Sequence, residues 1–293
     1  GNVQLLDKAG VIPGTVALNR KLIVVLGILL GGMCGIAIVL LRFYLKTGII
    51  DPKAFIDLGL TVRAAIPYSE NEVSLRPIEI PINKKHRKRS TKRKLNCSIL
   101  AHDYPDDSSI EALRSLRTSL RFLMSKTTDN LIMISSANPS EGKSFIAVNL
   151  AAVIAKSGKR VLVVDADMRK SYLHRMFGVS SKNGLSNILS GTLDSKNSIR
   201  ETDVDNLYFM PRGDTPTNPS ELLMSSNFEK LAKSLSNTFD LVIFDTPPIL
   251  AVTDASIIGS YCNLNMMVSR FDLSSTREVS AAKNRFNLNG IDI

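Results

Sequence analysis

Cysteine and histidine are scarce in this chain of 293 residues, and neither residue type is clustered. A disulfide framework needs paired cysteines at short spacings, and a zinc site needs His or Cys ligands a few residues apart. We therefore expect neither of these, and the scattered histidines give no support to a catalytic triad. Unclustered cysteines fit a reducing compartment. The positions are Cys34, Cys97, Cys262, His86, His102 and His174.

Charge is missing from residues 22–41, which read "LIVVLGILLGGMCGIAIVLL". An uncharged apolar run of this length is typical of a transmembrane helix. Gly27, Gly31 and Gly35 recur every four residues, which favours close packing against another membrane helix. The alternatives are a buried helix of a soluble core and a signal peptide. The run is long for either, and it lacks a clear cleavage site.

Acidic residues are missing from a second stretch, 84–94, which reads "KKHRKRSTKRK" and contains eight Lys or Arg. Such an excess beyond the apolar run predicts that the C-terminal side is cytoplasmic. Three interpretations are contact with anionic lipid, binding of nucleic acid, and a solvated linker. Nucleic acid is disfavoured because interleaved aromatics and a recognition motif are absent. We expect a basic juxtamembrane linker over 42–105 with lipid contact.

A near match to the phosphate-loop pattern G-x-x-x-x-G-K-[ST] lies at 137–144, "ANPSEGKS", with Ala137 in place of the first glycine. An apolar run precedes it and a helical pattern follows, which is the setting that a phosphate loop requires. Pro139 offers another way to fix the turn, through its restricted φ. An ordinary strand-to-helix loop that contains Gly-Lys-Ser by chance is the alternative.

In a phosphate loop, backbone N–H groups around Glu141, Gly142 and Lys143 would face phosphate oxygens at a helix N-terminus. The Lys143 ammonium would reach the β and γ phosphates, and the Ser144 hydroxyl would hold Mg²⁺. A side chain at Gly142 would obstruct the approach of a phosphate most directly.

Apolar runs alternate with helical patterns from Asp106 onward, beginning with the amphipathic segment "DDSSIEALRSLRTSLRFLM", in which Ser108 or Ser109 is the expected N-cap. Fully apolar strands between helices predict an α/β fold with a doubly wound, mostly parallel sheet of the P-loop NTPase kind. The expected strands are 131–134, 161–164, 207–210, 241–244 and 264–268. The expected helices between and after them are 144–156, 184–189, 228–235, 253–259 and 275–288.

Three aspartates follow the expected strands. Asp165 and Asp167 end "RVLVVDADMRK", and Asp245 ends the strand of "LVIFDTPP". Each could merely cap the next helix. In a parallel sheet, however, they share one edge with the phosphate loop. Mg²⁺ on phosphates takes one or two carboxylates, which leaves a third to act as a base.

These motifs resemble those of the bacterial tyrosine kinases (BY-kinases) of the Wzc type. The matching stretches are "SSANPSEGKS", "VVDADMRK", "LVIFDTPPILAVTDA", "PRGDTPTNPSELL" and "EALRSLRTSLRF", and the resemblance runs from the apolar helix to the last residue. It implies a protein-tyrosine autokinase that uses Mg²⁺ and ATP, lies in the bacterial inner membrane with its kinase domain in the cytoplasm, and regulates capsule or exopolysaccharide polymerisation and export.

The resemblance also implies residue roles. Asp165 would be the base for a tyrosine hydroxyl, and Lys143 would act with it in catalysis. Ser144, Asp167 and Asp245 would hold the metal. The residues that bind the nucleotide would be Ser140, Glu141, Gly142, Lys143, Ser144 and Phe145.

Further roles concern partners. Glu111, Arg114 and Arg117 form the E-x-x-R-x-x-R pattern that would mediate contact between subunits of a ring, although a solvated charged face is the alternative. Tyr172 could be modified or gate the site, or could be an ordinary surface tyrosine. Family resemblance adds phosphorylation of one copy by another, a cognate tyrosine phosphatase and an outer-membrane export channel.

The expected division of the chain is a remnant of a periplasmic domain (1–21), the membrane helix (22–41), the linker (42–105) and the kinase domain (106–293). Because the chain starts with Gly and stops at "NGIDI", we expect a fragment. The resemblance implies a tyrosine-rich C-terminal tail as the target of autophosphorylation, and this chain stops before one. Two other functions compete with this interpretation. A MinD/ParA-like ATPase has a lysine two residues into its loop, where this chain has Asn138. A non-catalytic chain-length regulator would have a degenerate site, whereas Lys143 and the aspartates are intact.

Overall fold

The computed structural model describes residues 20–44, 48–49, 51–75, 98–124 and 130–293. They belong to two compact units, which meet in the sequence between Lys46 and Thr47. Residues 1–19 of the expected remnant and the basic run 84–94 lie outside the described residues.

The described part of the first unit is helix α1, which extends from Arg20 to Tyr44. Its segment Lys21–Leu41 is long and apolar enough to cross a membrane, and none of it is buried inside the protein. A helix of 25 residues is about 37 Å long, which exceeds the roughly 30 Å of a bilayer's hydrocarbon core. The expected span 22–41 is therefore helical throughout.

Among the described residues, the second unit is built on a six-stranded sheet with the strand order β3-β4-β2-β5-β1-β6. All neighbouring strands are parallel except β3, which runs antiparallel to β4. The five expected strands are confirmed, but β3 was missed because it has only two residues. The strands are β1 (Leu131–Ser136), β2 (Val161–Asp165), β3 (Arg200–Glu201), β4 (Leu207–Met210), β5 (Leu241–Asp245) and β6 (Leu264–Val268).

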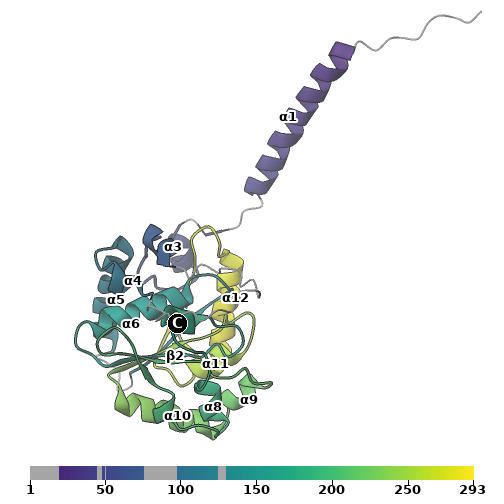
Figure 1. The fold of residues 1–293 in the computed structure, drawn as a ribbon. Helices are drawn as coiled ribbons and strands as arrows, with labels where there is room; N and C mark the ends of the chain where they lie inside the picture. Colours follow the sequence, from purple (N-terminus) through teal and green to yellow (C-terminus); the bar gives the residue numbers. More distant parts are fainter. Residues whose placement is uncertain (1–19, 45–47, 50, 76–97, 125–129) are drawn as a thin grey trace, which may run out of the picture. The chain divides into compact units, whose positions relative to one another are not determined.

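Helices cover both faces of this sheet, as Figure 1 shows. Alternate strand residues point to opposite faces: Ile132 and Ile134 pack with α5 and α6, whereas Leu131 and Met133 pack with the helices of the other face. The doubly wound fold is thereby confirmed. The helices are α2 (Lys53–Asp57), α3 (Glu70–Leu75), α4 (Leu100–Asp103), α5 (Ser108–Met124), α6 (Lys143–Ala155), α7 (Leu173–Met176), α8 (Leu185–Leu189), α9 (Pro219–Leu223), α10 (Ser226–Thr238), α11 (Asp254–Gly259), α12 (Thr276–Asn287) and the 3₁₀ turn Ser195–Asn197.

Helix α6 is buried around its whole circumference from Ile146 to Ala155, because it lies between the sheet and α5. This explains why its sequence is apolar on every side. Helix α5 is amphipathic, with Ile110, Leu113, Leu116 and Leu120 buried.

The N-cap of α5 is Asp107, so the expectation of Ser108 or Ser109 was wrong. The Asp107 carboxylate accepts hydrogen bonds from the backbone N–H and the hydroxyl of Ser109, at 2.9 and 2.7 Å. It also accepts one from the Ser69 hydroxyl at 2.6 Å. A segment assigned to the linker thus binds the start of α5. Ile99, Leu100 and Ala101 are buried in the same core.

Candidate functional site

The ends of β1, β2 and β5 form one edge of the sheet. Asp165 ends β2 and Asp245 ends β5, and the two residues are direct neighbours in the parallel register. Both are completely buried. Strand β1, on the other side of β5, leads at this edge into the phosphate-loop candidate. The predicted meeting of the loop with these aspartates is therefore present.

The loop explains why Ala137 can replace the first glycine. Ala137 is fully buried among apolar side chains and is not a left-handed position. The positive φ angles fall instead at Ser140 (66°) and Gly142 (96°). A Cβ on Gly142 would meet no atom of the described residues within 4 Å, so these residues leave the space in front of it open. Left-handed backbone and open space at 142 are what close approach of a phosphate requires.

Glu141 has a role that the sequence did not indicate, because its side chain is buried under the loop. Its carboxylate accepts hydrogen bonds from the Ser274 hydroxyl at 2.7 Å and from the backbone N–H of Asn138 at 3.2 Å. Burial raises the pKa of Glu141, and both hydrogen bonds oppose the shift. Arg270 donates to the Ser140 carbonyl at 3.4 Å. The segment after β6 thus supports the loop from one side.

The same segment also contacts the residues that follow α1 in sequence. The backbone N–H of Ile49 donates to the Ser274 carbonyl at 2.8 Å, and that of Asp272 donates to the Ile49 carbonyl at 3.1 Å. Ile49 is buried. Residues 48–49 are therefore part of the structure that supports the phosphate loop, although the sequence placed them in the linker.

Ser144 and Lys143 stand at the start of α6, which no side chain of the described residues caps. The Ser144 hydroxyl donates to Asp245 Oδ2 at 2.6 Å. Burial raises the pKa of Asp245 to about 6, against the opposing effects of the Lys143 charge and the Ser144 hydrogen bond. Phe145, the last residue of the expected nucleotide-binding set, is half-buried and packs against the core.

Asp165 has the most strongly perturbed environment at this edge. Among the described residues, none gives a hydrogen bond to either of its buried carboxylate oxygens, and Oδ1 of Asp245 also lacks one. Burial, followed by the charge of neighbouring Asp245, raises the pKa of Asp165 well above its ordinary value. The nearby Ser171 hydroxyl opposes this shift without reaching hydrogen-bond geometry. Buried carboxylates without partners indicate a place for a cation or a proton.

The donor set fits Mg²⁺ bound together with phosphates. No group of three His, Cys, Asp or Glu side chains in the described part of the chain could hold a metal without help. Mg²⁺ in phosphate sites commonly takes only one or two carboxylates and fills its shell with water and phosphate oxygens. Asp245 and the Ser144 hydroxyl, which already contact each other, meet that need.

Asp167 is buried, and one of its carboxylate oxygens is already hydrogen-bonded within its own turn. Its Oδ1 accepts the backbone N–H groups of Arg169 and Lys170, at 3.2 and 3.0 Å. The Arg169 guanidinium is in turn bound to Asp254, which the sequence analysis did not single out. The charge of Asp167 raises the pKa of Asp245, so the two carboxylates are electrostatic neighbours. Direct contact of Asp167 with a metal stays a prediction.

The remaining predicted residues lie outside this cluster. Arg114 on α5 pairs with Glu111 at 2.7 Å and donates to the Pro105 carbonyl. Arg117 donates to the Val153 carbonyl at 3.2 Å. Tyr172 is 64% exposed, with the Arg175 guanidinium 4.6 Å from its ring centre.

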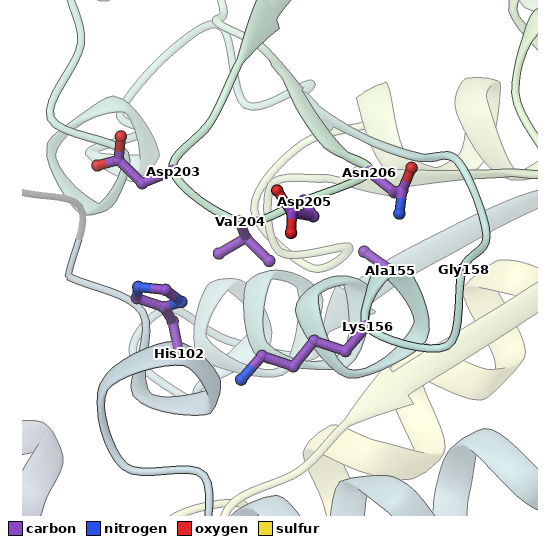
Figure 2. Close-up of a pocket in the computed structure, with 8 residues that line it drawn as sticks. All are labelled: His102, Ala155, Lys156, Gly158, Asp203, Val204, Asp205 and Asn206. Carbon is purple, nitrogen blue, oxygen red and sulfur yellow. The ribbon is translucent and has the colours of Figure 1, made fainter.

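A hollow of about 420 Å³ lies elsewhere, against the C-terminal end of α6. Figure 2 shows His102 and Lys156 facing a loop that contains Asp203 and Asp205. Helix α6 begins at the phosphate loop, so about 20 Å of helix separates the two places. The hollow does not belong to the candidate site.

Comparison with known families and relatives gives matches over both units. A family described as "AAA domain" matches residues 130–277, and a second, described as a G-rich domain, matches residues 1–44. "Tyrosine-protein kinase wzc" of Salmonella typhimurium is 41% identical over 293 residues, which is 100% of this chain and 40% of that protein. "Tyrosine-protein kinase etk" of Escherichia coli K12 is 39% identical over 296 residues, again 40% of its length.

Solved structures match the second unit closely. The kinase domain of Escherichia coli tyrosine kinase ETK superposes with a TM-score of 0.75 and 39% identity, over 84% of this chain and 92% of that one. The BceF tyrosine kinase domain gives a TM-score of 0.72 and 38% identity, over 84% and 96%.

Proposed function

Because this chain belongs to the bacterial tyrosine kinases, we propose that it is the membrane-anchored kinase part of a protein-tyrosine autokinase that uses Mg²⁺ and ATP. The observation that carries the proposal is a pair of buried carboxylates, Asp165 and Asp245, beside a Gly-Lys-Ser loop. Three of their four oxygens have no partner in the described part of the chain. Two adjacent buried carboxylates destabilise a protein unless a bound cation or proton offsets their charge.

The residues then divide the work of phosphoryl transfer. The Lys143 ammonium and the backbone N–H groups of residues 142–144 bind the β and γ phosphates. Ser144 and Asp245, with Asp167, hold Mg²⁺, which when bound offsets phosphate charge. Asp165 accepts the proton of the attacking tyrosine hydroxyl. Its raised pKa suits it to that task, because a carboxylate that binds protons more readily is a stronger base.

The partners follow from the same proposal. A second copy of the chain would supply the tyrosine, with contact through Glu111, Arg114 and Arg117 on α5, where Glu111 is well exposed. A tyrosine phosphatase and an outer-membrane export channel would act with it in capsule or exopolysaccharide export. The chain would lie in the bacterial inner membrane, held by α1, with its kinase domain in the cytoplasm and its basic run on anionic lipid. Tyr172 is exposed enough to be modified or to gate the site.

The test uses the protein in lipid nanodiscs with Mg²⁺, ATP and an added tyrosine-rich peptide. Phosphotyrosine is measured beside Lys143→Met and Asp165→Asn variants, over a range of protein concentrations. We expect phosphotyrosine in the parent protein and a loss of about 10²-fold or more in both variants.

The other outcomes separate the competing functions. ATP hydrolysis without any phosphotyrosine would favour a MinD/ParA-like ATPase. The absence of both activities at high protein concentration, where copies could assemble, would favour a non-catalytic chain-length regulator.

A further inference from the structure

Asp254, the first residue of α11, is completely buried. The Arg169 guanidinium donates to both of its oxygens, from Nε at 2.9 Å and from Nη2 at 3.1 Å. The Ser220 hydroxyl on α9 donates to Oδ1 at 2.6 Å and is itself 3.1 Å from Arg169 Nη2. We call these three residues the Asp254 clamp.

The clamp connects two segments that carry aspartates of the candidate site. Arg169 belongs to the turn after β2, in which its own backbone N–H binds the Asp167 carboxylate. Asp254 belongs to the segment after β5, which ends at Asp245. A carboxylate that binds a guanidinium through two nitrogens fixes its direction as well as its distance. The position of the turn relative to β5 therefore depends on Asp254.

We propose that Asp254 is a positioning residue for the phosphoryl transfer described above, on which this inference rests. With Ser220 it holds Arg169, and through the turn it keeps the Asp167 carboxylate aligned with Asp245 for binding of Mg²⁺ with the nucleotide. Asp254 itself contacts neither the metal nor the nucleotide. Residues that orient a metal ligand in this way commonly change metal affinity by about 10–100-fold when they are replaced.

The experiment measures binding of a fluorescent ADP analogue to the parent protein, to Asp254→Asn and to Ser220→Ala, once with Mg²⁺ and once with EDTA. The informative quantity is the ratio of the two affinities. We expect Asp254→Asn to reduce this ratio about 10-fold or more, while its affinity in EDTA stays within about twofold of the parent's. Ser220→Ala leaves the ion pair intact and should reduce the ratio less. If Asp254→Asn does not fold, Ser220→Ala still tests the proposal.

Asp240→Asn is the matched control. Asp240 lies just before β5 and is exposed. Lys159 Nζ lies 3.5 Å from its carboxylate, which also accepts the backbone N–H of Arg160 at 2.8 Å. Its replacement should leave the ratio unchanged.

Two results would overturn the inference, and they are distinguishable. If Mg²⁺ strengthens binding to folded Asp254→Asn and Ser220→Ala as much as to the parent, the clamp is only a structural ion pair. If Mg²⁺ does not strengthen binding to the parent either, the proposed kinase function fails, and this inference fails with it.

Discussion

Asp165 and Asp245, at the ends of neighbouring strands, are as completely buried as Asp254, which follows β5. Their carboxylates differ, however, in how many hydrogen bonds they accept. Of the four carboxylate oxygens of Asp165 and Asp245, three have no hydrogen-bond partner among the described residues. Both oxygens of Asp254 are bonded, by Arg169 and Ser220. A buried unpaired charge reduces stability, so a protein retains one mainly where a bound ligand offsets that charge. The difference separates residues poised for a ligand from those that hold the structure.

Replacing Asp165 by Asn should have the largest functional effect and should also raise stability. Loss of the base should reduce phosphotyrosine formation by about 10²–10⁴-fold. Without nucleotide, the temperature of unfolding should rise, because a buried charge beside Asp245 has been removed. Thermal unfolding in EDTA measures the second effect. A variant less stable than the parent would show that Asp165 already has a partner in the protein, and the contrast with Asp254 would fail.

Replacing Arg169 by Met should lower stability, because it breaks the ion pair with Asp254. It leaves Asp254 buried without a counter-charge, which costs about 3–5 kcal/mol of unfolding free energy. Asp254→Asn should cost less, because Arg169 is partly exposed and water can solvate it. Urea unfolding of both variants measures this order. Equal losses, or a smaller loss for Arg169→Met, would mean that the carboxylate is reached by water.

The sequence was enough to predict that Asp165 and Asp245 lie together, but not that Asp254 pairs with Arg169. Apolar runs ending in Asp165 and Asp245 are enough to place two carboxylates on one edge, since side chains at the ends of neighbouring parallel strands must meet. The partner of Asp254 lies 85 residues away, in a turn whose path no local pattern determines. The only local signal was a charged residue within the apolar stretch "AVTDASIIG".

Short elements escaped prediction for a related reason. Strand β3 and helix α7 have only two and four residues, too few to show a hydrophobic period. The buried orientation of Glu141 depends on Ser274, a contact across 133 residues. Tertiary contacts decide such features, whereas long periodic segments such as α5 are determined locally.

The pH dependence of stability offers a further comparison. The pKa of Asp245 is raised to about 6 from 3.8, so the folded protein holds this proton more tightly than the unfolded chain. Stability from this group is therefore fully present below about pH 4 and is lost as pH rises through about 6. Without nucleotide, the stability gap between the parent and Asp245→Asn should widen in the variant's favour across that window. A gap that is constant from pH 4 to pH 7 would contradict the shift.

Replacing Ser274 by Ala removes one of the hydrogen bonds to the buried carboxylate of Glu141. Glu141 would keep the Asn138 N–H but lose the Ser274 hydroxyl. An unsatisfied buried acceptor costs about 1–3 kcal/mol. Because Glu141 lies in the phosphate loop, affinity for the ADP analogue should also fall severalfold, in EDTA as well as with Mg²⁺. An effect seen only with Mg²⁺ would instead connect Ser274 to the metal.

The smallest effect is expected at Asp107, a carboxylate that is well bonded but only half-buried. Burial tends to raise its pKa, but hydrogen bonds from Ser69, Ser109 and Asn71 outweigh this and lower the pKa to about 2. Its contribution to stability is therefore present above about pH 4 and is lost as pH falls toward 2. Asp107→Ala removes an N-cap and should cost about 1 kcal/mol at neutral pH, with no change in Mg²⁺-dependent nucleotide binding. If binding did change, pairing and distance from the strand ends would not suffice to distinguish structural carboxylates from those of the site.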